Sequence, residues 1–340
     1  MTSTMRAVAC RASLPVTDDA CLLDVRLPVP APSPRDLLVQ VEAVAVNPVD
    51  HKIRQHQDSH GRERVLGWDA AGTVVATGSQ VENFAPGDEV FYAGALDRPG
   101  ANSEFHTVDE RLVALKPTTL TFTEAAALPL TSLTAWEGLF ERIGLRHDLI
   151  DETGSLLVTA AAGGVGSVVS QLAHALTDLT VIGTASRPET ADFARRMGVH
   201  HIVDHHQALL PQLAKVAPNG IDQVFSTAGT DRNLAAYAEA LNPFGQIVAI
   251  DDFDELPVGL LKPKSISFHW EFMFTRSLFR TADMDRQRRI LTQVARLVDA
   301  GVVVSTATRD LGPVNAANLR KAHGIMEAGT AIGKITLTGF

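Results

Sequence analysis

The sequence predicts an α/β protein in which a mostly-β domain precedes a doubly wound parallel sheet. A length of 340 residues favours two domains of ordinary size over a single core. Roughly the first hundred residues alternate short β-like runs with Gly, Pro, Asn and Asp, which is typical of a β domain. From about residue 123, apolar runs alternate with helical patterns, as in βαβ units. We therefore expect three segments, at residues 1–122, 123–264 and 265–340.

The individual elements follow from these patterns. The β-like runs of the first segment are Leu37 to Ala45, Ala71 to Thr77 and Glu89 to Tyr92. The strands of the second segment are Ser155 to Ala161, Thr180 to Ala185, His201 to Asp204, Gln223 to Thr227 and Gln246 to Ile250, and they suit a Rossmann sheet. After Pro263 we expect an apolar run at Ile266 to Phe274, helices near Asp283 to Ala300 and after Pro313, and a last strand at Lys334 to Thr338.

Composition excludes several classes of function. Hydrophobic residues make up 45% and charged residues 20% of the chain, as in a soluble globular protein. No apolar run approaches the roughly 20 residues that span a bilayer, and no secretory signal follows Met1, so we expect a cytoplasmic protein without a membrane partner. The net charge of −9 and the lack of a basic stripe argue against nucleic acid as a partner.

The two cysteines, Cys10 and Cys21, lie near the N-terminus. The stretch from Pro15 to Ala20 between them is typical of a hairpin turn. Two cysteines alone neither staple a large fold nor complete a tetrahedral metal site. We expect buried, reduced thiols.

The strand from Ser155 runs directly into a glycine-rich loop and then a helical segment. The loop reads Ala161, Ala162, Gly163, Gly164, Val165 and Gly166. Small residues are needed here because the backbone must turn tightly and approach a pyrophosphate that binds to N–H groups at the helix N-terminus. The loop therefore predicts a dinucleotide site that includes Ala161, Gly163, Gly164, Val165 and Gly166.

The end of the second parallel strand favours NADPH over NADH. NAD enzymes usually carry an acidic residue here to bind the ribose 2′-hydroxyl, whereas this chain has Ser186 and Arg187. A hydroxyl and a guanidinium suit a 2′-phosphate. A second interpretation remains open, in which Ser186 is the helix cap in a capping box with Glu189, after which Pro188 begins the first turn. In that case Glu189 supplies the anion beside Arg187.

These residues resemble the quinone oxidoreductase branch of the medium-chain dehydrogenase/reductases, over essentially the whole chain. The resemblance rests on the glycine-rich loop, Asn47-Pro48-Val49-Asp50 and Gly333-Lys334-Ile335. The segment from Ser267 to Ser277 resembles a subgroup labelled zinc-type alcohol dehydrogenase-like. The resemblance implies a GroES-like domain interrupted by a Rossmann domain, so that the C-terminal segment rejoins the first domain.

The resemblance also implies roles for individual polar residues. Asn47 and Asp50 are expected near the nicotinamide and substrate, Thr134 beside the cofactor, and Lys334 in contact with it. Each has a plainer interpretation. Asp50 suits a turn or cap after Pro48, Thr134 suits a helix hydroxyl that bonds its own backbone, and Lys334 suits a solvated strand end.

Zinc is not expected. Zinc alcohol dehydrogenases resemble this chain but place Cys at Asn47, His at Trp68 and a further ligand near Leu130 to Thr131, and no cysteine follows Cys21 to build a structural zinc lobe. Another cluster contains His200, His201, His205 and His206. Strand alternation points neighbouring side chains to opposite faces, so we expect surface histidines there rather than a metal site.

Without a metal, conjugated acceptors are the favoured substrates. Ketone reduction needs an acid or a metal at the carbonyl oxygen, whereas a quinone or an α,β-unsaturated carbonyl delocalises the developing charge. The Tyr-x-x-x-Lys acid of short-chain dehydrogenases is absent, because neither Tyr92 nor Tyr237 has a lysine four residues later. Aromatic and apolar residues that suit a substrate pocket, or equally plain core packing, are Trp68, Trp270, Met273 and Phe274. The proton donor stays unassigned.

Two alternatives to a quinone or enone reductase stay open: a zinc-type alcohol dehydrogenase, and an NADPH-binding sensor or structural protein with weak catalysis. The sequence does not identify the physiological substrate. The apolar run between Ile266 and Thr275 follows the last parallel strand, so we expect it to pair edge to edge in a homodimer.

Overall fold

The structure is a computed structural model that describes residues 3–56, 61–146 and 153–340. It divides into two compact units. Unit 1 comprises Met1–Leu130 and Phe274–Phe340, and unit 2 comprises Thr131–Met273. These divisions fall after Leu130 and Met273, and the boundaries expected from the sequence lie slightly earlier in the chain, at 122/123 and 264/265.

Unit 1 begins with a small antiparallel sheet of order β2-β1-β4. Its strands are β1 (Thr4–Cys10), β2 (Leu23–Pro28) and β4 (Arg64–Val65). Ala9 pairs with Leu23, so the chain reverses between them and the expected hairpin is confirmed. Cys10 and Cys21 are free and buried, as the sequence predicted.

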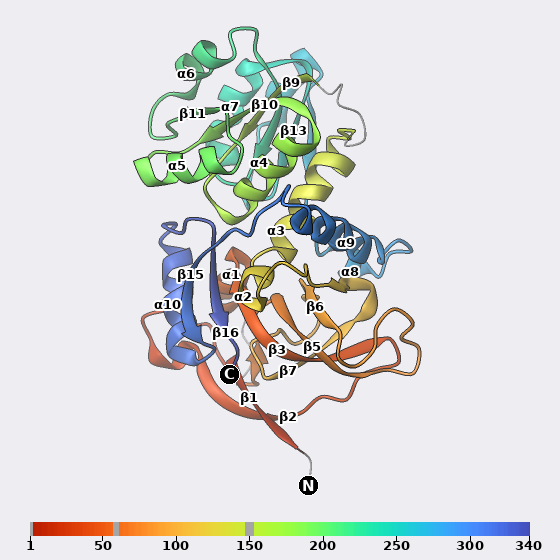
Figure 1. Cartoon of the computed structure of the whole chain (residues 1–340). Coiled ribbons are helices and arrows are strands. Elements are labelled where there is room, and N and C mark those ends of the chain that lie inside the picture. The colour runs from red at the N-terminus through yellow and green to blue at the C-terminus, as the bar shows by residue number, and fades with distance from the viewer. Residues whose placement is uncertain (1–2, 57–60, 147–152) are drawn as a thin grey trace. The chain divides into compact units, whose positions relative to one another are not determined.

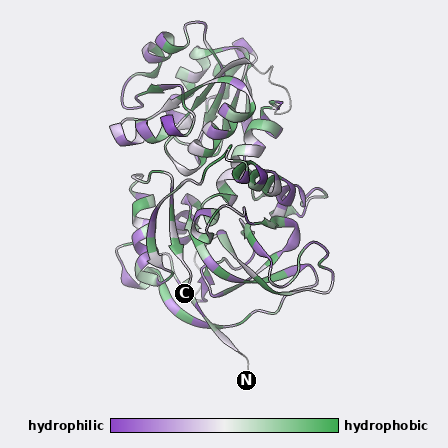
Figure 2. Cartoon of the chain, viewed as in Figure 1, coloured by the Kyte–Doolittle hydropathy of each residue, from purple (hydrophilic) through white to green (hydrophobic). Residues whose placement is uncertain are grey.

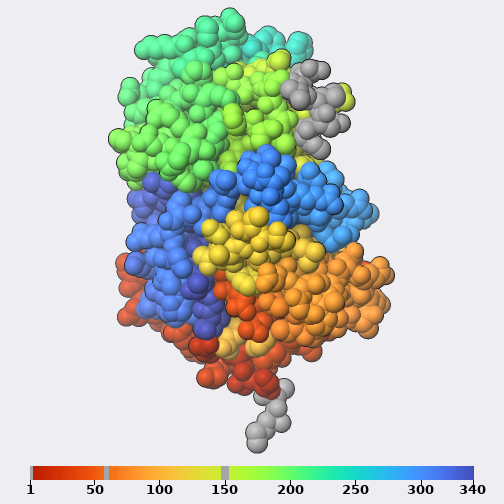
Figure 3. Space-filling view, viewed as in Figure 1, coloured from red at the N-terminus to blue at the C-terminus, as the bar shows by residue number. Residues whose placement is uncertain are grey.

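The larger sheet of unit 1 has the order β15-β16-β3-β5-β6-β8, and β7 pairs with β3 beside this path (Figure 1). Its strands are β3 (Asp36–Val46), β5 (Asp69–Thr77), β6 (Glu89–Tyr92), β7 (Phe105–Asp109), β8 (Val113–Leu115), β15 (Ala307–Pro313) and β16 (Lys334–Thr338). Antiparallel pairing of β16 with β3 places Ile335 opposite Val46. The C-terminal segment therefore completes the N-terminal sheet, as the resemblance implied, and Figure 3 shows blue residues of the C-terminal segment beside red and orange residues of the N-terminal segment.

Helices connect and cover these strands. They are α1 (Pro48–His56), α2 (Phe122–Ala126), α8 (Thr275–Phe279), α9 (Arg286–Asp299), α10 (Ala316–Glu327) and the 3₁₀ turns η1 (Asp19–Cys21) and η2 (Glu110–Leu112). Local sequence explains their starts. Thr121 and Glu124 form a capping box at α2, and Asn315 caps α10 by accepting from the Asn318 N–H. The helix α3 (Pro129–Trp136) crosses from unit 1 into unit 2.

Unit 2 is a parallel sheet of order β11-β10-β9-β12-β13-β14 (Figure 1). Its strands are β9 (Thr153–Val158), β10 (Asp178–Thr184), β11 (His201–Val203), β12 (Ile221–Ser226), β13 (Leu241–Ala249) and β14 (Ser267–Trp270). The strand order reverses between β9 and β12, which is the Rossmann arrangement. The predicted doubly wound sheet is confirmed, with strand bounds that differ from those expected by a few residues.

The helices of unit 2 are α4 (Gly164–Leu176), α5 (Pro188–Arg196), α6 (Leu209–Val216), α7 (Thr230–Ala240), the π-helical η3 (Glu137–Arg142) and the 3₁₀ segment η4 (Val258–Lys264). The connection from β9 to β10 and that from β12 to β13 run in opposite directions along the sheet. Right-handed crossovers therefore place α4 and α7 on opposite faces. Figure 2 shows largely hydrophobic strands between helices of mixed colour, and the core between α7 and the sheet includes Leu157, Val224 and Ile247.

No helix within the described ranges is both long enough and apolar enough to cross a bilayer.

Candidate functional site

The glycine-rich loop connects β9 to α4 through a strained turn. Ala160 has a φ of 44°, in the left-handed region that residues with a Cβ rarely adopt. Two hydrogen bonds hold it there. Its N–H donates to Thr184 Oγ1 over 2.9 Å, and its carbonyl accepts from the Gly163 N–H over 2.8 Å. The chain then enters α4 at Gly164, so the loop takes the short route that a dinucleotide turn requires.

Close packing explains why glycine is needed in this loop. A Cβ on Gly166 would lie 2.4 Å from the Ala160 carbonyl oxygen, so any larger residue would push the helix away from the strand. The first N–H groups of a helix have no partner within it, and here they belong to Gly164, Val165 and Gly166. With Gly163 as the N-cap, this helix start suits the pyrophosphate of a dinucleotide. Ala161 is buried beneath the loop.

The end of β10 carries Ser186 and Arg187, and no acidic residue stands between Thr184 and Pro188. The helix α5 begins at Pro188 with Arg187 as the N-cap, and the Thr190 hydroxyl donates to the Arg187 carbonyl over 2.7 Å. The alternative interpretation, a capping box formed by Ser186 and Glu189, is therefore wrong, because the observed capping residues are Arg187 and Thr190, each one residue later. Arg187 does pair with Glu189, at 3.4 Å between Nε and Oε1, and both side chains are partly exposed.

Unit 1 contains a buried polar cluster around the end of β3. The Lys334 ammonium donates to three acceptors: the Val46 carbonyl at 3.0 Å, the side-chain oxygen of Asn47, and Asp69 Oδ2 at 2.9 Å. The Asn47 amide also donates to Asp69 Oδ2, over 2.8 Å. Lys334 is 2% exposed. The alternative of a solvated lysine at the strand end is therefore wrong.

Asp50 belongs to the same cluster and holds the turn between β3 and α1. Its Oδ2 accepts from the Asn47 N–H over 2.8 Å. Its Oδ1 is buried and accepts no hydrogen bond from the residues that the structure describes. Burial raises the pKa of Asp50 to about 7, against the lowering effects of the Asn47 N–H and of the Lys334 ammonium. The structure thus places Asp50 in the turn role that the sequence left open, with a protonatable oxygen beside Asn47.

Asp69, at the start of β5, is a site residue that sequence reasoning missed. Both of its oxygens are engaged, because Oδ1 accepts from the Leu130 N–H over 2.7 Å while Oδ2 accepts from Asn47 and Lys334. The available signal was a lone acidic residue next to Trp68 at the head of an otherwise apolar strand. Such a carboxylate needs a buried cation, which here is Lys334.

The four predicted pocket residues fall into separate surroundings. Within unit 1, Trp68 and Phe274 meet edge to face with ring centroids 6.5 Å apart, and the Trp68 indole N–H donates to the Ala95 carbonyl. Within unit 2, Met273 is buried, whereas Trp270 is 53% exposed on β14. The Trp270 ring stacks on Phe253 at 4.8 Å and meets Phe268 edge to face at 5.4 Å. Thr134 is a buried residue of α3 in unit 2.

The residues at the expected zinc positions are poor metal ligands. The Asn47 side-chain oxygen already accepts a hydrogen bond from the Lys334 ammonium, and the Trp68 indole nitrogen is a donor without a lone pair for a metal ion. Among the described residues, no three His, Cys, Asp or Glu side chains converge as a metal site would require. At the histidine cluster, His200 Nδ1 accepts from the Val181 N–H, which leaves Nε2 to donate to His174 Nδ1 over 3.2 Å. Both nitrogens of His200 are therefore engaged.

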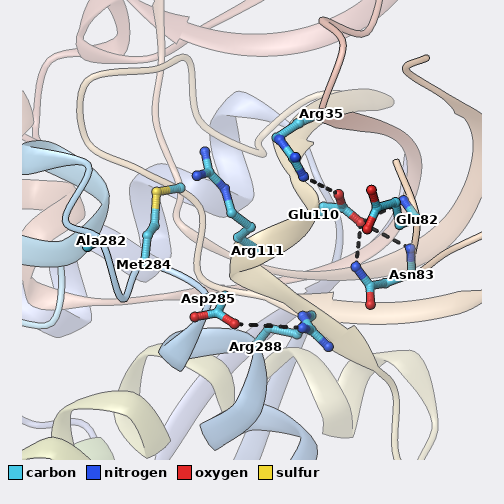
Figure 4. Close-up of a pocket in the computed structure, with 9 residues that line it drawn as sticks. All are labelled: Arg35, Glu82, Asn83, Glu110, Arg111, Ala282, Met284, Asp285 and Arg288. Carbon is cyan, nitrogen blue, oxygen red and sulfur yellow. Dashed lines mark hydrogen bonds and ion pairs between the residues drawn. The ribbon is translucent and has the colours of Figure 1, made fainter. Parts of the chain in front are cut away.

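A separate pocket in unit 1 has a volume of about 290 Å³ and contains none of the predicted site residues (Figure 4). Acidic and basic side chains both line this pocket. Arg35 pairs with the buried Glu110 at 3.1 Å, and Arg288 lies 3.9 Å from Asp285. The second Glu110 oxygen accepts from the backbone and side chain of Asn83. Because the carboxylates already have donors, this pocket is best explained as the charged seam between η2 and α9.

Two family models match the chain. The alcohol dehydrogenase GroES-like domain covers residues 33–118, and the zinc-binding dehydrogenase domain covers residues 164–282. A zinc-type alcohol dehydrogenase-like protein of Staphylococcus aureus (strain MSSA476) is 39% identical over 310 residues, which are 91% of this chain and 92% of that one. The NADPH-dependent alkenal/one oxidoreductase of Arabidopsis thaliana chloroplasts is 34% identical over 68% of this chain and 59% of its own.

Solved structures give the same result. A protein of Rhizobium etli CFN 42, provisionally described as a zinc-dependent alcohol dehydrogenase, is 48% identical with a TM-score of 0.96, covering 100% of this chain and 99% of its own. The Escherichia coli quinone oxidoreductase complexed with NADPH has a TM-score of 0.81 at 22% identity, covering 99% of this chain and 100% of its own, which shows a shared fold. Together with the GroES-like and Rossmann units, these matches show that the chain is an oxidoreductase of the medium-chain dehydrogenase/reductase superfamily.

Proposed function

We propose that the protein reduces a quinone or an α,β-unsaturated carbonyl with NADPH and without zinc. The observation that carries this proposal is the buried cluster at Asn47, Asp69 and Lys334. Zinc dehydrogenases that resemble this chain carry a cysteine ligand at the position of Asn47. In this protein the Lys334 ammonium donates hydrogen bonds to the Asn47 side-chain oxygen and to an Asp69 oxygen. A zinc ion there would face an ammonium and no thiolate or imidazole.

Substrates that need little acid catalysis suit such a site. The bound nicotinamide would supply a hydride, and a conjugated acceptor spreads the resulting negative charge over several atoms. Hydrogen-bond donors and the exclusion of water then suffice, so that placing the acceptor accounts for most of the catalysis. We assign orientation of the nicotinamide and substrate to Asn47 and Thr134, and contact with the cofactor to Lys334. Asp50 holds the Asn47 backbone through its carboxylate.

Two relatives support this substrate class by name. One is the Arabidopsis alkenal/one oxidoreductase, and the other is the 2-methylene-furan-3-one reductase of Solanum lycopersicum, which is 37% identical over 62% of this chain and 54% of its own. The glycine-rich loop and the Ser186-Arg187 pair support NADPH as the cofactor. In NADP enzymes an arginine near the end of the second strand accommodates the 2′-phosphate.

The test compares substrate classes on the same preparation. We expect turnover of quinones and enones with NADPH, and poor oxidation of simple alcohols with NADP. Efficient alcohol oxidation alongside inert quinones and enones would refute the proposal. No turnover of any member of the panel, with tight NADPH binding, would favour the alternative of a nucleotide sensor or structural protein.

The zinc proposal has its own measurement. Elemental analysis of the purified protein should find no stoichiometric zinc, and activity should survive a chelator. One zinc per chain, lost together with activity on chelation, would instead indicate a zinc-type alcohol dehydrogenase.

We also propose a homodimer that pairs through β14. This strand stands at the end of the sheet order β11-β10-β9-β12-β13-β14, and Trp270 stacks on Phe253 at this edge while 53% exposed. An edge strand with an exposed aromatic cluster is a natural site for pairing between two copies. Light scattering at micromolar concentration should give twice the mass of one chain, and a monomer would contradict the proposal.

A further inference from the structure

We propose that Arg54 positions Asn47 for hydride transfer by anchoring α1 to α10. This inference rests on the proposed function, in which Asn47 orients the nicotinamide and the substrate. Arg54 is fully buried in unit 1 and acts through the helix that follows Asn47. It is therefore a positioning residue rather than a catalytic one.

The helix α1 is held mainly by polar contacts. Its fully buried side chains are those of Asp50 and Arg54, whereas Val49 and Ile53 are only partly buried. Asp50 and Arg54 lie four residues apart and so share one face of the helix. Apolar contacts are non-directional, whereas a hydrogen bond restricts the positions of its donor and acceptor. The hydrogen bonds of these two side chains therefore determine where α1 lies within unit 1.

The Arg54 guanidinium donates to acceptors in two other segments. Its Nε donates to His323 Nδ1 over 3.3 Å, and a terminal nitrogen donates to Glu327. Both acceptors belong to α10, which packs against α1 (Figure 1). The other terminal nitrogen donates to the Leu14 carbonyl, between β1 and η1. Arg54 thus fixes the second half of α1 through three directional contacts.

His323 serves Arg54 as a neutral acceptor. Because its Nδ1 accepts from Arg54, the ring proton lies on Nε2, which is buried and has no acceptor among the described residues. Burial, and next the charge of Arg54, lower the pKa of His323 to about 3. The imidazole is therefore uncharged near neutral pH, and the negative partner of Arg54 is Glu327.

The first turn of α1 carries this anchorage to Asn47. Asn47 directly precedes the helix, and its N–H donates to Asp50 Oδ2 over 2.8 Å. Its side chain is bonded to Asp69 and Lys334 on the sheet, so a shift of α1 would turn Asn47 relative to these partners. A misplacement of about 1 Å, even when caused by a distant residue, can slow a reaction about a hundredfold.

The first experiment measures hydride transfer in Arg54→Lys. This variant keeps the charge but loses the planar fork that reaches three acceptors. Single-turnover oxidation of bound NADPH by menadione should slow about tenfold to a hundredfold. The dissociation constant of NADPH should stay within about twofold, because the proposed phosphate contacts belong to unit 2.

Arg320→Lys is the matched control. Arg320 lies on α10 and connects it to the same N-terminal segment, donating to the Asp19 and Leu22 carbonyls and pairing with the Asp19 carboxylate at 3.0 Å. In the described part of the chain it makes no hydrogen bond to α1. This variant should lose comparable hydrogen bonds and retain the wild-type rate of hydride transfer.

Hydrogen exchange gives a readout that does not depend on turnover. In the free protein the Asn47 N–H should exchange about tenfold faster in Arg54→Lys, and at the wild-type rate in Arg320→Lys. Glu327→Gln is a milder second variant, because its partly exposed side chain can still accept from Arg54. It should show faster exchange and slower hydride transfer, each to a smaller extent.

The outcomes separate this inference from the proposed function. An unchanged rate of hydride transfer in Arg54→Lys, or an equal slowing in Arg320→Lys, would overturn the positioning role and leave the proposed function intact. If Arg54→Lys does not fold, an unchanged rate in Glu327→Gln overturns the role. A wild-type protein that binds NADPH but reduces neither quinones nor enones would overturn the proposed function and this inference together.

Discussion

Removal of the Lys334 ammonium is the sharpest perturbation of the unit 1 cluster. In Lys334→Met the side chain keeps its length and loses its charge, so Asp69 keeps the Asn47 amide and the Leu130 N–H as donors but loses its cation. The Asp69 side chain is fully buried, and it cannot recover this loss by contact with water.

The magnitude follows from the burial of both partners. Breaking a buried ion pair by removing one member costs about 3–5 kcal/mol, because the other charge stays buried without compensation. Asp69→Asn should be destabilising in the same range, since it leaves the ammonium with two neutral acceptors. If the two groups act mainly on each other, the double variant should lose less than the sum of the single losses, by about 1–3 kcal/mol.

The assay is urea unfolding at neutral pH, combined with hydrogen exchange of peptides from β3 and β16. Exchange should increase in these two strands first, because Lys334 begins β16, while its acceptor Val46 ends β3 and its acceptor Asn47 follows directly. The control is Lys321→Met, an identical change at an exposed position of α10. Losses below about 1 kcal/mol, with additive single effects, would refute the claim that this pair is a buried, mutually dependent unit.

Four further changes test other parts of the structure. Arg187→Ala should weaken NADPH by about 1–3 kcal/mol and leave NADH nearly unchanged in binding titrations, and equal losses for both would sink the phosphate assignment. Gly166→Ala should instead weaken both cofactors alike, because the added Cβ meets the Ala160 carbonyl oxygen at 2.4 Å, and selective loss of one would contradict this. Asp50→Asn should flatten the pH dependence of unfolding. Since burial raises the pKa of this carboxyl to about 7, wild-type stability should fall as pH rises from about 4 to about 7, and an unchanged slope in the variant would exclude Asp50 as the cause. Trp270→Ser should shift the protein toward monomer in light scattering, whereas an intact dimer would move the interface away from β14.

Features set by neighbouring residues were predictable from the sequence. The dinucleotide loop follows from a strand, a run of small residues and a helix in direct succession, and Gly166 occupies a position that this turn restricts to glycine. The final strand was located at Lys334–Thr338 and Glu89–Tyr92 was identified with its observed bounds, because turn residues flank both. In each case the information lies within about ten residues of chain.

Features set by distant residues were not predictable in this way. Asp69 lies 22 residues from Asn47, 61 from Leu130 and 265 from Lys334, and no local pattern connects these positions. The start of α5 shows a subtler limit. Ser186 and Thr190 both have hydroxyl groups that suit a helix cap. In the structure it is the Thr190 hydroxyl that bonds to the backbone of Arg187 at the start of α5.

The pairing of β16 with β3 has a consequence for the order in which a ribosome delivers the parts of unit 1. The acid of the buried pair, Asp69, is made 265 residues before its cation. At about 5–20 residues per second, the nascent chain carries that carboxylate unpaired for roughly 13–53 seconds. Unit 2 is continuous from Thr131 to Met273 and is complete during this interval, so we expect it to fold first and unit 1 to close only after β16 has been made. Proteolysis of a chain stopped before Lys334 tests this order: unit 2 should resist digestion while the residues of unit 1 are cut, and equal resistance of both would show that the N-terminal sheet does not wait for its last strand.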